Sequence, residues 1–538
     1  EEESPRRSPF ATLSHYCRAV CWSPVNFGQV SDLLSITGLR KYSKSQGFSS
    51  GWAKTLRFLT RLRGGDSHPA PVVVHSQELS ATRETAMRPK SPEAPTDDLF
   101  RSSLEAILDP GHELIRLAAL IDWGRFDDAF GAHYHERKGR PGLPTRLMVG
   151  LHLLKHMKGL SDEETCAAWL ENPYFQAFCG ETHFQHRLPL DRSSMTRWRR
   201  RIGAADLEAV LAETISVAVK TKAVSQRQLE RITVDTTVQT KAIAHPTDSH
   251  LILRAIEWLN RAAKRHGVKL RQSFLRLATR ARRDAARLMN TRGHKQGLRW
   301  VRKMRTWLGR LIRDIRRRIA GDQALEAAFA TPLERAQRIL DQQPDDKNKL
   351  YALHAPEVEC IGKGKARTRY EFGVKTSIAT TNERTRGGQF VLGAQVLPGN
   401  PYDGHTLADQ IDQVARLTST AVRRAYVDRG YRGHKIEREG LDITISHTRG
   451  ITSPTVRREM RRRNGIEPVI GHLKEDGHLE RNHLAGPEGD RINAVLCAAG
   501  HNMRLLARWL RLLFAILLAV MRGREMETAQ RSLNQDPP

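Results

Sequence analysis

Three carboxylates in this 538-residue sequence lie where regular secondary structure is expected to begin or end. Asp235 lies in the alternating segment RITVDTTVQTKAI, Asp428 directly follows AYV, and Glu467 directly precedes a proline. Each acid alone also fits a simple role on an edge strand, in a turn or in the first turn of a helix. Buried carboxylates, however, need partners, and Mg²⁺ prefers such hard oxygen ligands. Because paired Mg²⁺ ions promote in-line displacement at phosphate, the three acids are candidates for a phosphoryl-transfer site.

The segments around these acids predict an α/β layered domain with a mixed sheet. Alternating or β-branched runs bounded by turn residues predict strands at 231–243, 368–381, 389–399, 425–428 and 441–446. A helix is expected at 403–418 and again after the last strand. The sheet would therefore position Asp235 within a strand and Asp428 at the end of another.

Glu467 lies at the edge of a helical apolar stripe formed by Ile466, Val469, Ile470 and Leu473. The proline after Glu467 is tolerated only in the first turn of a helix, so the helix should begin near residues 464–465. This start places the Glu467 carboxylate at the open end of the helix. Lys474, seven residues further on, falls close to the same helical face, although by itself it could be an ordinary solvated lysine.

Residues 104–203 show helical apolar spacing and end in a strongly basic segment. Ser161 and Glu164 form the sequence signature of a capping box. The basic segment fits a helix-turn-helix-like DNA-binding unit or, equally, a solvated helix of a dimerisation domain. The arginines concerned are Arg197, Arg199, Arg200 and Arg201.

The chain carries a net charge of +29 with a pI of about 10.4, which favours a polyanionic partner, nucleic acid first. Residues 254–320 hold 22 Lys and Arg against 3 acids, and we expect basic helices facing solvent or phosphate. Ribosomes or anionic membranes are the competing partners. The apolar run at 512–521 is too short to span a membrane, and we expect a buried terminal helix. The six cysteines do not form a zinc pattern.

Four motifs together resemble the DDE transposases of bacterial insertion sequences, most closely the IS-five group. They are VDTT from 234, HPTD from 245, VDRGYRG from 427 and RNGIEPVIGHLK from 463, within a resemblance that covers roughly 104–510. Arg463, Glu467 and Lys474 fit the Y-R-E-K signature of that group, whereas Met460 replaces its tyrosine. The resemblance implies an RNase H-like core and an acidic triad of Asp235, Asp428 and Glu467 that binds Mg²⁺, with Mn²⁺ as a substitute.

The implied function is transposition: binding of the terminal inverted repeats of the element, metal-dependent DNA strand cleavage and strand transfer. Arg463, Lys474 and the four arginines of the basic segment would contact double-stranded DNA, and we expect a homodimer in the bacterial cytoplasm, without a membrane. His245 and Asp248 would line the site or only form a turn. The alternatives are a catalytically inactive DNA-binding derivative and an RNase H-like nuclease.

The expected organisation has four parts. Residues 1–86 would be an upstream or disordered extension, and 87–225 a helical DNA-binding or dimerisation domain. Residues 226–521 would form the RNase H-like catalytic domain with a helical insertion at about 250–350, and 522–538 a disordered tail.

Overall fold

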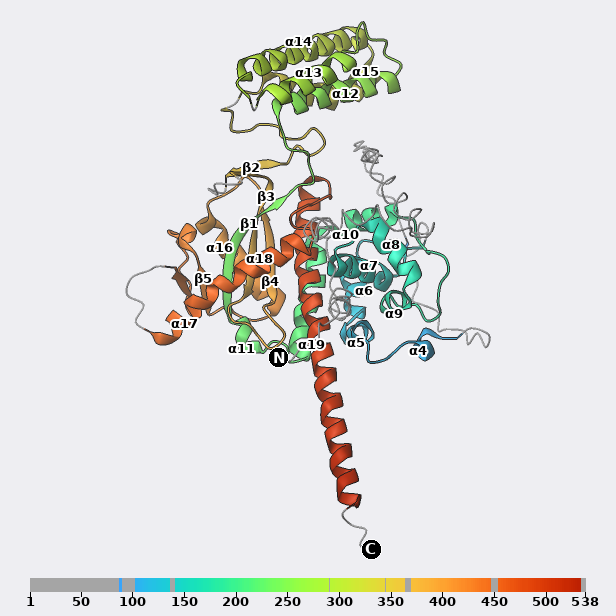
Figure 1. The fold of residues 1–538 in the computed structure, drawn as a ribbon, viewed down its shortest axis with the longest axis vertical. Coiled ribbons are helices and arrows are strands. Elements are labelled where there is room, and N and C mark those ends of the chain that lie inside the picture. The colour runs from blue at the N-terminus through green and yellow to red at the C-terminus, as the bar shows by residue number, and fades with distance from the viewer. Residues whose placement is uncertain are drawn as a thin grey trace, which may run out of the picture. The chain divides into compact units, whose positions relative to one another are not determined.

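The structure is a computed structural model, which describes residues 87–89, 102–135, 141–289, 291–343, 345–362, 369–446 and 453–533, with side chains described up to Met521. The extension expected at 1–86 lies outside these residues. Figure 1 shows helices, a mixed sheet and a separate group of helices inserted between two strands of that sheet. The protein is therefore mixed α/β with helices at its N-terminal side, as expected.

The described residues between 104 and 229 form helices joined by loops. The helices are α4 (Leu104–Ile107), α5 (Glu113–Leu120), α6 (Gly124–Gly131), α7 (Thr145–Lys158), α8 (Asp162–Glu171), α9 (Pro173–Phe178), α10 (Ser193–Lys220) and α11 (Gln226–Leu229). The predicted capping box is present at the start of α8, where the Ser161 hydroxyl accepts a hydrogen bond from the Glu164 N–H. The long helix α10 is kinked at Gly203, whose φ of 81° is available mainly to glycine.

The mixed sheet contains six strands. They are β1 (Arg231–Thr240), β2 (Glu359–Gly362), β3 (Tyr370–Thr381), β4 (Val391–Leu397), β5 (Arg424–Val427) and β6 (Asp442–Ile445). β1 pairs antiparallel with β3, which also pairs antiparallel with β2 and β4, while β5 runs parallel to both β1 and β6. The predicted strands are confirmed; the short strand β2 was not predicted, because four residues give too little alternation.

Residues between β1 and β2 form the insertion bundle, which we define as α12 (Asp248–Arg265), α13 (Leu275–Met289), α14 (His294–Ile319) and α15 (Gln323–Asp341). These helices bury a hydrophobic cluster of their own that includes Leu259, Met304, Leu308 and Phe329. The bundle therefore has its own core, as expected for a unit that folds from a contiguous stretch of chain.

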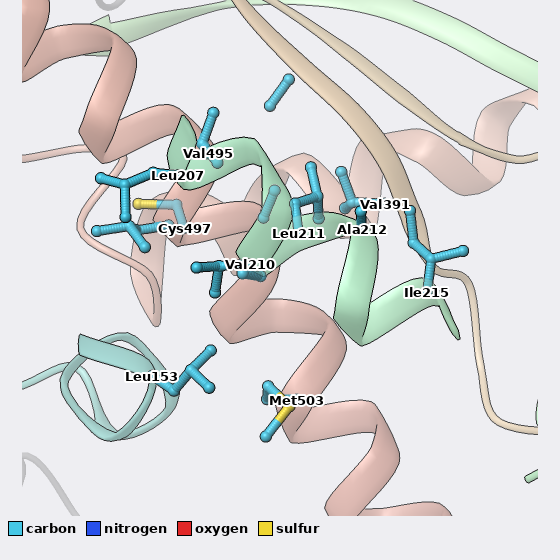
Figure 2. Packing of buried hydrophobic residues seen from close by; sticks show 14 of the residues in the cluster. Leu153, Leu207, Val210, Leu211, Ala212, Ile215, Val391, Val495, Cys497 and Met503 are labelled. Carbon is cyan, nitrogen blue, oxygen red and sulfur yellow. The ribbon is translucent and has the colours of Figure 1, made fainter. Parts of the chain in front are cut away.

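The N-terminal helices and the sheet share one hydrophobic core. Figure 2 shows part of it, where Leu153 of α7, Leu211 of α10, Val391 of β4 and Met503 of α19 (Gly486–Leu533) contribute to one cluster. Trp169, also in this cluster, has no exposed surface. The N-terminal helices are thus packed into the body that carries the acids. Among them, α10 contacts the sheet at β4.

The remaining helices follow the sheet strands. They are α16 (Asp403–Thr418), α17 (Pro454–Arg462) and α18 (Ile466–Glu475), with short 3-10 segments η2 (Arg429–Tyr431) and η3 (Arg463–Gly465). α16 packs against β3 and β4, and α18 packs against β1. The prediction of a helix at 403–418 is confirmed, and α18 begins one residue after the expected position.

Two expectations about the C-terminal helix were wrong. The apolar run of α19 is not buried, because Leu512, Ile516, Leu517, Val520 and Met521 are each about half exposed. The helix also continues through the expected disordered tail to Leu533, because helix-forming residues follow without a proline stop. Among the described helices, none is both long and apolar enough to cross a membrane.

Candidate active site

Asp235 is held in the middle of the sheet by strand pairing on β1. Its neighbours Val234 and Ile378, the latter opposite it on β3, are fully buried. The Asp235 carboxylate is 14% exposed and accepts a hydrogen bond from the Thr236 N–H at 2.8 Å. Burial and the nearby Asp428, with a smaller contribution from Glu467, raise the pKa of Asp235 to about 6. Asp428 and Glu467 thus both lie close enough to Asp235 to disfavour its ionised form.

Asp428 caps the turn that follows β5. Its Oδ1 accepts a hydrogen bond from the Gly430 N–H at 2.8 Å, which closes η2. A Cβ atom at position 430 would lie 3.0 Å from Asp428 Oδ1 and 2.9 Å from Asp403 Oδ2. A side chain at position 430 would therefore have to displace at least the Asp403 carboxylate.

Glu467 lies in the first turn of α18, on the side of the sheet that this helix covers. Ile466, Val469 and Leu473 are buried and fix the helix on β1, whereas Glu467 is exposed. The apolar stripe therefore positions the helix, and the acid at its edge stays accessible. The partial positive charge at a helix N-terminus favours a carboxylate at this place.

Arg463 is a basic residue that lies directly beside Asp235. Its Nη1 lies 3.6 Å from Asp235 Oδ2, and its side chain is only 15% exposed. Arg463 also lowers the pKa of Asp235, in opposition to the larger effect of burial. The guanidinium thus provides a counter-charge at the centre of the acidic site.

Asp403 is a fourth carboxylate near the site, and the sequence analysis did not include it among the candidate residues. Its Oδ1 lies 2.6 Å from Lys375 Nζ and accepts a hydrogen bond from the Thr236 hydroxyl at 3.1 Å. Asp403 therefore ties α16 to β1 and β3, next to the Asp428 turn. The signal that could have found it is the segment NPYDGHT, where an acid begins a helix after a strand.

The α17 helix is anchored beside the site by a buried glutamate that sequence reasoning also missed. Glu459 is 2% exposed and forms ion pairs with Arg231 at 3.2 Å and with Arg424 at 3.3 Å. It also accepts a hydrogen bond from the Tyr426 hydroxyl. Since Arg231 begins β1 and Arg424 begins β5, Glu459 fixes the helix that precedes Glu467 against the two strands that carry the aspartates.

The donor atoms of the site suit a hard divalent cation, because they are carboxylate oxygens and because Asp428 and Glu467 both act electrostatically on Asp235. As they stand, no three Asp, Glu, His or Cys side chains among the described residues lie close enough to hold one ion together.

Lys474 and the two predicted site-lining residues have partners other than the three acids. Lys474 Nζ lies 3.4 Å from a Glu371 oxygen and lines a cavity of about 490 Å³ that also includes Lys241 and Arg481. His245 is exposed and its ring lies 5.5 Å from that of Phe372.

Asp248 begins α12 and lies 3.5 Å from Arg305 of α14. Its ion pair belongs to the insertion bundle, so a role in lining the acidic site is not supported by its contacts.

The four arginines of the basic segment do not share one environment. Arg197 and Arg200 are exposed, and the Arg201 guanidinium lies 5.2 Å from the ring centroid of Tyr134. Arg199 is 4% exposed and bound to Asp162. The expectation that Arg199 contacts DNA therefore needs correction, because its guanidinium is turned into the protein.

Comparisons with known proteins find two transposase domains in the chain. Residues 102–201 match the family described as Transposase domain (DUF772), and residues 338–503 match Transposase DDE domain. "Uncharacterized protein ORF8 in nfe locus" of Rhizobium meliloti is 53% identical over 206 residues, 38% of this chain and 99% of that protein. No solved structure matches. Because a transposase domain and a transposase DDE domain match in this order along one chain, the chain belongs to the DDE transposases, DNA-binding and typically metal-dependent enzymes of DNA transposition.

Proposed function

We propose that this protein is the transposase of an insertion sequence of the IS-five group, binds the terminal inverted repeats of that element, and catalyses strand cleavage and strand transfer. The observation that carries the proposal is that burial, Asp428 and Glu467 together raise the pKa of Asp235, which relates both other acids to the strand aspartate. The spacing of Arg463, Glu467 and Lys474 supports the assignment to this group.

The catalytic core is proposed to be RNase H-like. The strand order supports this: β4, β3 and β1 are antiparallel neighbours, and β5 and β6 continue the sheet parallel to β1. Asp235 and Asp428 come from the adjacent strands β1 and β5, and Glu467 from a helix that packs on β1.

Asp235, Asp428 and Glu467 would hold Mg²⁺, with Mn²⁺ as a substitute. The bound ions would stabilise the charge that develops at the reacting phosphate and lower the pKa of the attacking water. Arg463, already 3.6 Å from Asp235, would orient a phosphate beside the carboxylates. Asp428 is held in place by the Gly430 N–H, so it is fixed before DNA binds.

The exposed Arg197 and Arg200, with Arg201 and Lys474, would contact the backbone of the element ends. The reaction requires two ends at once, and a homodimer would supply one acidic site for each end.

The test is the cleavage of a labelled duplex that carries one end of the element, in the presence of Mg²⁺. We expect the wild-type protein to nick the duplex at the repeat boundary and the Glu467→Gln variant to bind it equally well without nicking. The matched control is Glu475→Gln, at the other end of the same helix, which should nick normally. A Glu467→Gln variant that still nicks bound ends would refute the role of Glu467; binding without cleavage by every protein would favour an inactive DNA-binding derivative. Cleavage of branched or hybrid substrates without a repeat would favour a nuclease.

A further inference from the structure

Two helices of the insertion bundle carry rows of exposed cations, which we call the α13–α14 face. On α13 the row follows the spacing i, i+4, i+7, i+11, and on α14 it extends from Lys295 to Arg317. All members are exposed: Arg276, Arg280, Arg283 and Arg287 on α13, and Lys295, Arg299, Arg302, Lys303, Arg310, Arg313 and Arg317 on α14.

The rows point away from the core of the bundle. The buried residues of α13 are Ala278, Ala281 and Ala285, and the row lies on the opposite side of that helix. On α14 the cations likewise lie on the side of the helix opposite the buried residues Met304 and Leu308. Arg287 and Arg317 have side chains that are 78% and 66% exposed. The cations are therefore presented to solvent.

Acidic residues are almost excluded from these two helices. Together α13 and α14 hold 15 Lys and Arg against 2 acids, whereas α12 and α15 hold 6 against 5. Of the two acids, Asp314 is 7% exposed and is engaged by Arg318 at 3.2 Å and by the Arg271 N–H at 2.9 Å. Asp284 lies 3.8 Å from Arg287. The positive charge is thus concentrated on one pair of helices of an otherwise balanced bundle.

Such a face is not explained by the stability of the bundle. Like charges spaced at i, i+3 and i, i+4 repel one another and destabilise a helix by a few tenths of a kcal/mol per pair. The bundle is held by its apolar cluster, to which the outward arginines do not belong. A regular row of repelling cations therefore indicates an external polyanion that offsets the repulsion.

We propose that the α13–α14 face binds the phosphate backbone of double-stranded DNA without regard to sequence. This rests on the proposed function and adds a second DNA contact that lies outside the terminal repeats. The row on α14 is roughly 33 Å long at 1.5 Å per residue, close to one turn of B-DNA. α13 packs beside α14, so a second row accompanies the first. Arginine side chains spaced along a helix face match phosphates rather than base edges.

The experiment uses the full chain and two 30-base-pair duplexes, one of random sequence and one that carries an element end. The affinity is measured by fluorescence anisotropy over a series of salt concentrations. One variant replaces Arg276, Arg280, Arg283 and Arg287 by Gln, and a second replaces Arg299, Arg302, Arg310 and Arg313. The matched control removes four cations from α12 of the same bundle, namely Arg254, Arg261, Lys264 and Arg265.

We expect each α13 or α14 variant to bind at least tenfold more weakly, and the slope of log K against log salt to become shallower by about 3 to 4, since each lost phosphate contact accounts for about 0.9. The α12 control should change the slope by less than one. Unchanged slopes in both variants would overturn the proposal, as would an equal loss in the control. A loss confined to duplexes with an element end would also overturn it, because the face would then read sequence.

This outcome is separable from the test of the proposed function. Random-duplex binding does not depend on Glu467, so the Glu467→Gln variant should retain the wild-type salt slope. If wild type fails to nick the element end while the α13 and α14 variants lose random-duplex binding, the proposed function fails and the DNA-binding face stands.

Discussion

The Arg199 guanidinium donates two hydrogen bonds to the Asp162 carboxylate, from Nη1 to Oδ1 at 3.0 Å and from Nη2 to Oδ2 at 2.6 Å. Lys155 Nζ lies 2.6 Å from the same carboxylate, and His152 Nε2 lies 3.1 Å from Arg199 Nη1. Arg199 and Lys155 together hold the pKa of Asp162 well below its usual range, against the opposing effect of burial. The cluster ties α7, α8 and α10 together.

The first prediction separates Arg199 from its exposed neighbour. Arg199→Met should lower the free energy of unfolding by about 3 kcal/mol, because it leaves Asp162 with only Lys155 as a buried partner. Arg200→Met should change it by less than about 0.5 kcal/mol, but should weaken DNA binding. Urea denaturation and duplex-binding titrations measure the two effects. Equal stability of the two variants would contradict the structural role of Arg199.

The second prediction concerns acid stability and His152. Burial, helped by Arg199, lowers the pKa of His152 to about 3, while the unfolded chain titrates near the ordinary value of 6.5. The neutral ring donates from Nδ1 to the Met148 carbonyl at 2.7 Å and can accept from Arg199. Its contribution to stability is therefore complete above pH 6.5 and is lost as the pH falls from 6.5 toward 3, at about 1.4 kcal/mol per pH unit.

A His152→Gln variant isolates this contribution, because other buried histidines remain in both proteins. Between pH 6.5 and 4.5 the unfolding free energy of the variant should fall less steeply than that of wild type, by about 1.4 kcal/mol per pH unit. Urea denaturation at a series of pH values provides the measurement. Parallel curves would show that His152 does not remain neutral in the folded protein.

The third prediction concerns the Asp403–Lys375 pair. The Lys375 side chain is 13% exposed, so Asp403→Asn leaves a largely buried cation without its carboxylate and should destabilise the protein by about 2 kcal/mol. Lys375→Met instead leaves the Asp403 carboxylate without its cation. The double variant should recover part of the loss, with a coupling of about 1 to 2 kcal/mol. Additive losses in this double-mutant cycle would mean that the pair contributes nothing beyond packing.

The fourth prediction concerns the base of the insertion. Lys241 lies 2.9 Å from Glu357 and 2.7 Å from Asp490, and all three side chains are nearly buried. Lys241→Met leaves two carboxylates facing each other without a cation and should cost about 3 to 5 kcal/mol. Hydrogen exchange should accelerate at the end of β1 and in β2. Unchanged exchange there would show that this ion-pair network does not fasten the insertion.

Local patterns were sufficient to predict the strands and helix that carry the acids. Apolar and polar residues alternate along β1, and β5 is followed by turn residues. The limits of α16 follow from an acid at its start and from apolar residues that recur with helical spacing along its whole length. The burial of Arg199 could not be predicted, because a basic helix face looks the same whether its partner is solvent or Asp162. The proximity of Asp403 to Asp428 depends on tertiary packing, and the exposure of Leu517 depends on how far the neighbouring helices reach.

The ion pair between Lys241 and Glu357 joins the two ends of a loop of more than one hundred residues. β1 and β3 can therefore pair as if the bundle were a short turn, although the chain between them contains four helices. Doubling the length of a closed loop costs only about 0.6 kcal/mol. The stability of the sheet therefore depends little on how many residues the loop contains. Because the insertion is closed at its base, the length and surface of the bundle can diverge among relatives. The strand that presents Asp235 would keep its register.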